Sequence, residues 1–239
     1  MYWTAGKLLS LWPLALCAFL AGCFEVDTSA NFYRQGQAKV KVEFAVSAEL
    51  MAFAANPQFQ KDGQSPVDWF DKCGEETSSS QLPDGVKSVR STSGQRSGMF
   101  TCTIDAEVID PIAAIKTARE KQSGGPDLSI EKLHSADGYR IQATIAPPAD
   151  GPFSSDKPED GFANSVAIAM FANRFITITL QGLRIENHNG ELSEDQTKAV
   201  WKIPLLGVIG PGAKKPFEIK ADVIYAEPWY IGLKRKLFG

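Results

Sequence analysis

The stretch Val40-Lys41-Val42-Glu43-Phe44-Ala45-Val46 alternates apolar and polar side chains, which predicts a β-strand with one buried face. The stretch Phe24-Glu25-Val26-Asp27-Thr28 alternates in the same way, and Gln35-Gly36-Gln37 between the two predicts a hairpin turn. We therefore expect the folded part of the chain to begin with an antiparallel hairpin.

Further strands are predicted wherever an apolar or alternating run lies between turn residues. The run Phe175-Ile176-Thr177-Ile178-Thr179-Leu180 is the clearest of them, because β-branched residues dominate it. The other predicted strands are 86–91 and 99–108, paired around Ser93-Gly94-Gln95; 128–133 and 139–145, paired around Asp137-Gly138; 183–186 and 198–205, flanking an elaborated hairpin at Asn189-Gly190; and 217–225.

Two helices are predicted from their start signals. Ser65-Pro66 begins one that ends at Gly74, and Asp110 before Pro111 begins another over 110–122. Residues 146–161, rich in proline and acidic residues, predict a loop or linker, while periodicity leaves open whether 164–173 form a helix or a strand. The expected fold class is α+β. We expect a curved, mostly antiparallel β-sheet packed by one to three helices, in a single domain over 23–226.

The N-terminus carries one charge, Lys7, followed by an apolar run that closes in Leu20-Ala21-Gly22-Cys23. This pattern predicts a secretory signal over 1–22, because the run is shorter than the roughly 20 residues of a membrane span and Pro13 interrupts it. Small residues before a cysteine resemble the lipobox of bacterial lipoproteins. The resemblance implies cleavage before Cys23, a diacylglycerol thioether on its sulfur and acylation, for example by palmitate, of its new amine. An ordinary cleavable signal and an uncleaved anchor are the alternatives.

Two cysteines, Cys73 and Cys102, remain in the body of the chain once Cys23 is an anchor and Cys17 is removed with the signal. An exported compartment is oxidising, so the pair is expected to form one disulfide. The sequence has no second cysteine pair and no Cys/His cluster that would form a metal site. It also lacks the Cys-x-x-Cys spacing of a redox site. No metal and no cofactor are therefore expected.

Charge is distributed unevenly along the chain. The formal net charge of −3 argues against nucleic-acid binding, yet 198–239 hold eight Lys/Arg against three Asp/Glu, a net of +5. The tail 227–239 combines aromatic and basic side chains, a composition that suits a membrane interface. The candidate membrane-contact residues are Trp229, Tyr230, Lys234, Arg235 and Lys236. A frayed terminus with one or two docked aromatics is the alternative.

Catalytic signatures are missing from the sequence. His134, on a predicted strand, and His188, beside Asn189-Gly190, have no nucleophile placed near them by any motif. The acidic residues of the loop 156–160 lack the alternate-residue spacing of a calcium loop, and no phosphate-binding glycine motif or Gly-x-Ser-x-Gly is found. We predict a protein that is not an enzyme.

A late stretch of the chain resembles a known family. It consists of the strand 175–180 ending in Gln181-Gly182, then Asn189-Gly190, then Ala199-Val200-Trp201-Lys202-Ile203-Pro204. Together with the lipobox and the early hairpin, this order is similar to the LppM-like lipoprotein domain, although Gln181 stands where a proline is expected. The resemblance implies an exported, non-enzymatic α+β domain similar to envelope proteins that bind lipid or another amphiphile.

These observations favour a membrane-tethered envelope lipoprotein that binds lipid or another amphiphile. The alternative is an envelope scaffold that docks a protein partner through its basic end or a sheet edge. Because position 24 is Phe and not the aspartate that retains many enterobacterial lipoproteins at the inner membrane, a cell with two membranes would place the protein at the outer membrane, facing the periplasm.

Overall fold

The computed structural model describes residues 24–54, 73–74, 82–121, 127–147, 168, 171–209, 213 and 215–227. Within this part of the chain, the larger of two sheets has seven strands in the order β3-β4-β2-β1-β7-β10-β9. Its strands are β1 (Phe24–Tyr33), β2 (Gln37–Ser47), β3 (Val86–Arg96), β4 (Met99–Val108), β7 (Phe175–Gln181), β9 (Glu191–Leu192) and β10 (Lys198–Pro204).

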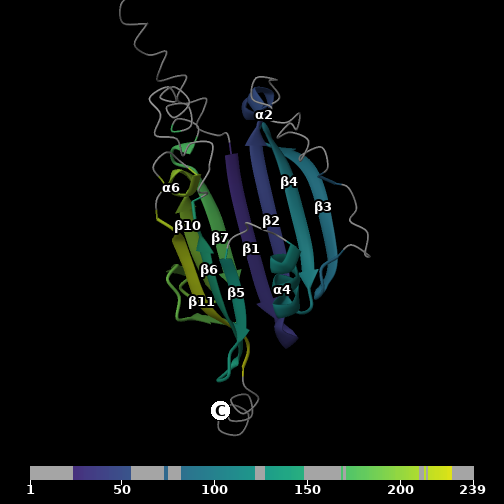
Figure 1. The fold of residues 1–239 in the computed structure, drawn as a ribbon, viewed down its shortest axis with the longest axis vertical. Coiled ribbons are helices and arrows are strands. Elements are labelled where there is room, and N and C mark those ends of the chain that lie inside the picture. The colour runs from purple at the N-terminus through teal and green to yellow at the C-terminus, as the bar shows by residue number, and fades with distance from the viewer. Residues whose placement is uncertain are drawn as a thin grey trace, which may run out of the picture.

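The smaller sheet has four antiparallel strands in the order β5-β6-β11-β8. They are β5 (Asp127–Lys132), β6 (Asp137–Ile145), β8 (Arg184–Glu186) and β11 (Phe217–Ala226). The helices of the described residues are η2 (Arg34–Gly36), a single 3-10 turn, and α2 (Ala48–Ala54), α4 (Pro111–Lys121) and α6 (Leu205–Ile209). Figure 1 shows the two sheets as twisted layers, with α4 in front of the larger one.

This architecture confirms the predicted α+β class with mostly antiparallel strands. The early hairpin is formed by β1 and β2, with Phe24 opposite Val46, and its turn lies at Arg34–Gly36. The clear strand prediction at 175–180 is β7, which lies parallel to β1 with Ile176 opposite Val26. The sheet is therefore mixed at its centre, because a strand from the second half of the chain is inserted beside the first strand.

The predicted helix at 110–122 is α4. Oδ1 of Asp110 accepts hydrogen bonds from the backbone N of Ile112 and of Ala113, each at 3.1 Å, so Asp110 is the N-cap residue that the sequence indicated. Pro111 follows at the first helical position, where its missing N–H is not needed.

Several predictions of turns and pairing were wrong. The β3–β4 turn lies at Ser97-Gly98, not at Ser93-Gly94-Gln95, and both turn residues have positive φ, 52° and 79°. Asp137-Gly138 begins β6 and does not form the turn, so that His134 lies in the connection rather than on a strand.

The elaborated hairpin between 183–186 and 198–205 is also absent as a strand pair. In the structure β8 joins the smaller sheet beside β11, whereas β10 joins the larger sheet between β7 and β9. Helix α2 was not predicted at all. Residues 65–72 of the predicted helix, all but the first residues of the loop 146–161, and most of 164–173 lie outside the described residues.

One face of the larger sheet, here called the inner face, packs against α4 and the smaller sheet. The core includes Phe32, Ala38 and Leu180 from the larger sheet and Tyr139, Ile141 and Val223 from the smaller one. Tyr139 connects the layers, because its hydroxyl donates a hydrogen bond to the carbonyl of Gly36 at 3.1 Å and its ring lies 5.8 Å from that of Phe32 on β1, centroid to centroid. The opposite face of the larger sheet is called the outer face.

The two ends of the larger sheet differ in what they carry. Strand β1 begins at one end, here called the anchor end, and the registers place Ser47, Met99, Phe175 and Pro204 at the same end. Helices α2 and α6 continue directly from β2 and β10 there. At the other end, here called the far end, β1 turns through η2 and β11 terminates beside it. Figure 1 shows α2 and α6 at the top of the larger sheet.

Candidate functional site

The predicted lipidation residue, Cys23, lies outside the described residues, but its sequence neighbour does not. Strand β1 begins at Phe24, the residue that follows Cys23. A single residue spans at most about 3.6 Å. The backbone of the larger sheet therefore starts within one residue of the predicted anchor, with no spacer between them.

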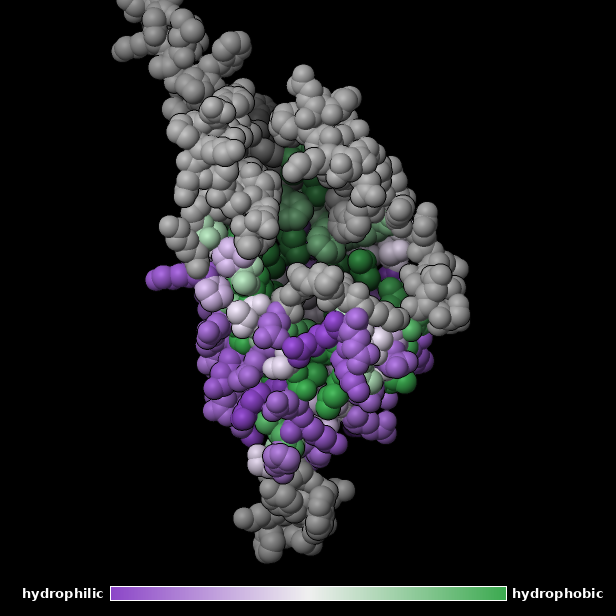
Figure 2. Space-filling model, viewed as in Figure 1, coloured by the Kyte–Doolittle hydropathy of each residue, from purple (hydrophilic) through white to green (hydrophobic). Residues whose placement is uncertain are grey.

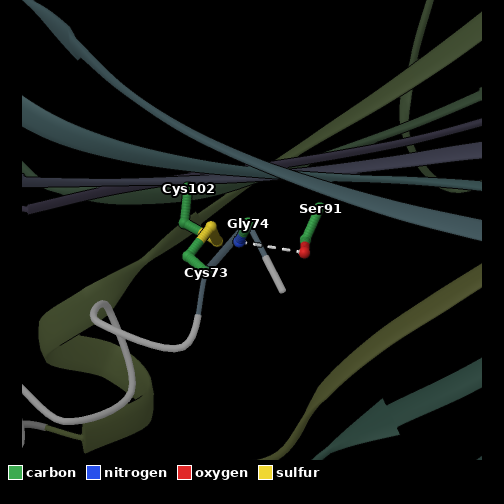
Figure 3. Close-up of a disulfide and its surroundings, with 4 residues drawn as sticks. All are labelled: Cys73, Gly74, Ser91 and Cys102. Atoms are coloured by element: carbon green, nitrogen blue, oxygen red, sulfur yellow. Dashed lines mark hydrogen bonds between the residues drawn. A yellow bond between two sulfur atoms is a disulfide. The ribbon is translucent and has the colours of Figure 1, made fainter. Parts of the chain in front are cut away.

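The predicted disulfide between Cys73 and Cys102 is present in the structure, with a Cα–Cα distance of 5.9 Å. Cys102 lies on β4 opposite Phe44 of β2, hence on the inner face. The backbone N of Gly74 donates a hydrogen bond to Oγ of Ser91 on β3 at 3.0 Å, also on this face (Figure 3). The bond thus fixes the 73–74 turn over the inner face of β3 and β4, and both cysteines are consumed by it.

The tail residues Trp229, Tyr230, Lys234, Arg235 and Lys236 lie outside the described residues. The place where the tail begins is known, however, because Glu227 follows β11 at the far end of the domain. A strand of ten residues such as β1 is about 33 Å long. The tail therefore leaves the domain at the end opposite to Cys23.

The inner face carries apolar rows that run across neighbouring strands. In one row Thr28, Val42 and Ile104 lie side by side on β1, β2 and β4, and in the next Val26 and Phe44 lie beside Cys102. Val26, Val42, Phe44, Phe100 and Ile104 are half-buried and lie on the anchor side of the core that α4 covers. Figure 2 shows apolar residues of the sheet gathered above α4.

The outer face is polar at the corresponding level. A shallow groove of about 720 Å³ crosses five strands of this face. One register row in it contains Thr179, Ser29, Lys41, Asp105 and Arg90, and the next contains Gln181, Asn31, Lys39, Glu107 and Ser88. Alternation along β1, β2 and β4 thus separates an apolar inner surface from a charged outer one.

Ion pairs connect the charges of the outer face near the anchor end. Arg96 pairs with Glu25 at 3.4 Å and with Glu43 at 2.8 Å, and Arg174 pairs with Glu25 at 3.6 Å. Lys41 pairs with Glu43 at 3.0 Å. Most of these side chains are partly solvated, so the pairs are expected to contribute little stability.

Asp222 is the one buried carboxylate among the described residues, with 3% of its surface exposed. It accepts hydrogen bonds from Nε and Nη2 of Arg140 at 2.8 and 2.9 Å and from Nδ2 of Asn187 at 2.7 Å. These hydrogen bonds, those from Arg140 first, hold its pKa below the usual range despite burial. Arg140 lies on the neighbouring strand β6 and Asn187 directly follows β8, so these hydrogen bonds join parts of the smaller sheet.

The histidines do not form a catalytic set. Nδ1 of His188 lies 2.9 Å from the carbonyl of Gly190, and His134 is exposed in the β5–β6 connection. Among the described residues, no three His, Cys, Asp or Glu side chains converge as a metal site would require. No helix of the described part is both long enough and apolar enough to cross a bilayer.

The glycines of the late motif have packing roles. A Cβ at Gly182 would lie 2.7 Å from the carbonyl oxygen of Ile224, and one at Gly190 would lie 2.6 Å from Cε2 of Trp201. Both positions therefore need glycine because the smaller sheet or the indole approaches the backbone closely. The two glycines thus serve close packing, whereas Ile176 and Ile178 of the motif strand continue the apolar rows, opposite Val26 and Thr28 of β1.

Comparisons with known proteins give a single weak likeness. No protein-family model and no curated protein sequence matches this chain. Among solved structures, the fold is similar to the NMR structure of the LppM folded domain from Mycobacterium tuberculosis, with a TM-score of 0.44 and 12% sequence identity over 87% of this chain and 93% of that one. The LppM-like resemblance noted in the sequence is thus found in the structure as well, as a weak one.

Proposed function

We propose that this chain is an exported bacterial envelope lipoprotein, tethered through acyl chains on Cys23, whose domain is not an enzyme and binds lipid or another amphiphile. In a cell with two membranes, Phe24 favours the outer membrane, with the domain facing the periplasm. The single observation that carries the ligand proposal is the half-buried apolar surface of Val26, Val42, Phe44, Phe100 and Ile104 on the inner face.

The tether is supported by three features. Leu20-Ala21-Gly22-Cys23 resembles a lipobox, β1 starts directly after it, and the Cys73–Cys102 disulfide suits an oxidising, exported compartment. Two or three acyl chains bury enough methylene groups, at about 0.8 kcal/mol each, for stable anchoring.

The ligand class is supported by the chemistry of the two faces of the larger sheet. Apolar surface outside a core attracts apolar groups from water, and the inner-face rows offer no charged side chain to recognise a polar substrate. An amphiphile could place its apolar part along these rows and leave its polar group at the edge of the sheet.

Intact-mass analysis of the protein from its native membrane tests the tether. The wild type should begin at Cys23 and carry a diacylglyceryl mass, and Cys23→Ser should lose that mass. A wild-type chain without the modification would refute the lipoprotein assignment, whatever the domain binds.

The ligand proposal is tested with the Cys23→Ser protein, because it lacks acyl chains of its own. Lipid extracted from it after gentle purification should fall several-fold in Val42→Trp, which places a bulky side chain among the apolar rows of the inner face. Lys41→Trp is the matched control, since it adds the same side chain one residue away on the outer face. Equal lipid in both variants, or none above an unrelated exported protein, would contradict the proposal.

A scaffold that docks a protein partner is the second candidate, and the polar groove of the outer face favours it. Strand β3 is also the edge of the larger sheet among the described residues, and an edge strand can pair with an extended segment. Photo-cross-linking in cells from position 41 or 90 should then give one discrete adduct. Diffuse adducts from both positions would count against a specific partner.

A further inference from the structure

The helices at the anchor end of the domain are rich in apolar residues. Helices α2 (Ala-Glu-Leu-Met-Ala-Phe-Ala) and α6 (Leu-Leu-Gly-Val-Ile) both lie there, and Glu49 is the single charged residue in the two sequences. In α6, Leu205 and Val208 are buried in the protein, whereas Leu206 is half-buried and Gly207 is exposed. Phe175, at the start of β7, has 42% of its surface exposed, and Ile168, just before this strand, has 48%. These apolar groups come from three separate parts of the chain.

The connections at the far end are different in character. They contain the exposed charged residues Arg34, Asp84 and Asp110, together with the 193–197 turn, in which Asp195 accepts hydrogen bonds from Ser193 and Thr197. Three apolar residues, Ile109, Ile112 and Leu183, are also exposed there, at 49%, 39% and 48%. Both ends of the larger sheet therefore expose a few large apolar side chains. The anchor end differs in that it also carries α2 and α6, two short helices with one charged residue between them.

We propose that the anchor end is a bilayer-contact surface, in which α2, the Leu206-Gly207 side of α6 and Phe175 lie in the boundary between the headgroups and acyl chains. This rests on the proposed tether at Cys23. Since β1 starts one residue after Cys23, acyl chains on that sulfur hold this end, and no other, at the bilayer surface. Short apolar helices at such a boundary bury their side chains by about 5–10 Å without crossing the membrane.

This proposal places membrane contact at the anchor end, whereas the sequence suggested the tail 227–239. The aromatic and basic tail departs from the far end, about 33 Å from the bilayer by the length of β1, whereas α2, α6 and Phe175 need no extension to reach it. The row that contains Phe24, Val46 and Phe100 is the last row of the inner face at this end. The apolar inner surface therefore continues to the bilayer-contact surface.

The test uses the mature, lipidated protein in vesicles of phosphatidylethanolamine and phosphatidylglycerol that carry brominated acyl chains. An added cysteine is the only free thiol, because Cys73 and Cys102 are paired and Cys23 is a thioether. A bimane label is placed at Phe175→Cys or Gly207→Cys in one pair of proteins. Leu183→Cys and Ile109→Cys are the matched controls, with similar exposure at the far end.

The labels at positions 175 and 207 should lose most of their fluorescence to the brominated chains, and those at 183 and 109 should lose none. Quenching at neither 175 nor 207, or equal quenching at all four positions, would overturn the proposal while intact mass still established the tether. An unmodified Cys23 would overturn the tether first, and the mass would show this independently of the fluorescence. Hydrogen exchange in α2 and α6 of the unlabelled protein provides a second readout, and exchange that vesicles do not slow would also overturn the proposal.

Discussion

The indole Nε1 of Trp201 donates a hydrogen bond to Oδ1 of Asn189 at 2.8 Å, and the same oxygen accepts one from the backbone N of Lys220 at 2.8 Å. Nδ2 of Asn189 donates in turn to the carbonyl of Glu218 at 2.9 Å. Trp201 lies on β10 of the larger sheet, whereas Lys220 and Glu218 lie on β11 of the smaller one. Asn189 therefore joins the two sheets, and the Asn-Gly and Val-Trp residues of the sequence pattern form a structural joint between them.

Replacing Asn189 by alanine should destabilise the domain by about 1–3 kcal/mol, because the indole N–H of Trp201, 3% exposed, would lose its acceptor. Denaturant unfolding followed by tryptophan fluorescence measures the change. Asn31→Ala, at an exposed position of the outer face, should change stability by less than about 0.5 kcal/mol. Equal effects of the two substitutions would show that the joint contributes nothing of its own.

Gly190→Ala should cost about 1–3 kcal/mol for a different reason, namely overpacking. The new Cβ would lie 2.6 Å from Cε2 and 2.9 Å from Cδ2 of Trp201, which is itself held by Asn189. Gly207→Ala is the control, since its Cβ would approach Cβ of Pro204 at an ordinary 3.9 Å and alanine favours the helix. The melting temperature should fall in the first variant and stay level or rise in the second.

Asp222 predicts a pH dependence of stability. Hydrogen bonds from Arg140 hold its folded-state pKa below the value of an unfolded aspartate, about 3.9. The stability that this carboxylate contributes is therefore fully present above the unfolded pKa and is lost as pH falls through the folded pKa. Asp222→Asn should be less stable than the wild type at neutral pH, and the difference should shrink in acid. A difference in unfolding free energy that stayed constant from neutral to acidic pH would contradict this assignment.

Tyr139 predicts how the stability of the domain changes at alkaline pH. Burial is the main cause that raises its pKa to about 12, and an unfolded tyrosine titrates near 10. Its contribution is present below the unfolded pKa and is lost between about pH 10 and 12, because only the unfolded chain ionises readily there. Tyr139→Phe should lose about 1 kcal/mol at neutral pH with the hydrogen bond to Gly36, and its stability should fall less steeply in alkali. An alkaline limb of unchanged slope would rule out this role for Tyr139.

The sequence predicted the elements whose signals are local. The hairpin β1–β2, strand β7, and helix α4 with its Asp110 cap all followed from alternation, β-branched runs or a capping residue. The β3–β4 turn failed because two Ser-Gly dipeptides lie four residues apart, at 93–94 and 97–98, and composition could not choose between them. Helix α2 was missed although Oγ of Ser47 accepts a hydrogen bond from the N of Leu50 at 3.2 Å, a cap without the glutamate at the expected spacing.

Pairings between distant segments could not be predicted from local patterns. The parallel contact of β1 with β7 and the division of β8 and β10 between two sheets depend on which apolar faces meet in the core. The same limit applied to the candidate site. Alternation indicated that Val42 and Lys41 face opposite ways, but only the topology shows that the Val42 face continues to the end of the sheet where β1 begins and α2 and α6 lie.

The disulfide gives the last prediction. Cys73 and Cys102 are separated by 29 residues, and closing a loop of that size lowers the entropy of the unfolded chain by the equivalent of about 3–4 kcal/mol. The double variant Cys73→Ser, Cys102→Ser should lose that stability in denaturant unfolding, and reduced wild type should match it. Because the bond also fixes the 73–74 turn on the inner face, both should take up a hydrophobic dye more strongly than the oxidised protein. Lower stability with unchanged dye uptake would separate the two roles. The bond would then restrain the unfolded chain without controlling access to the apolar rows.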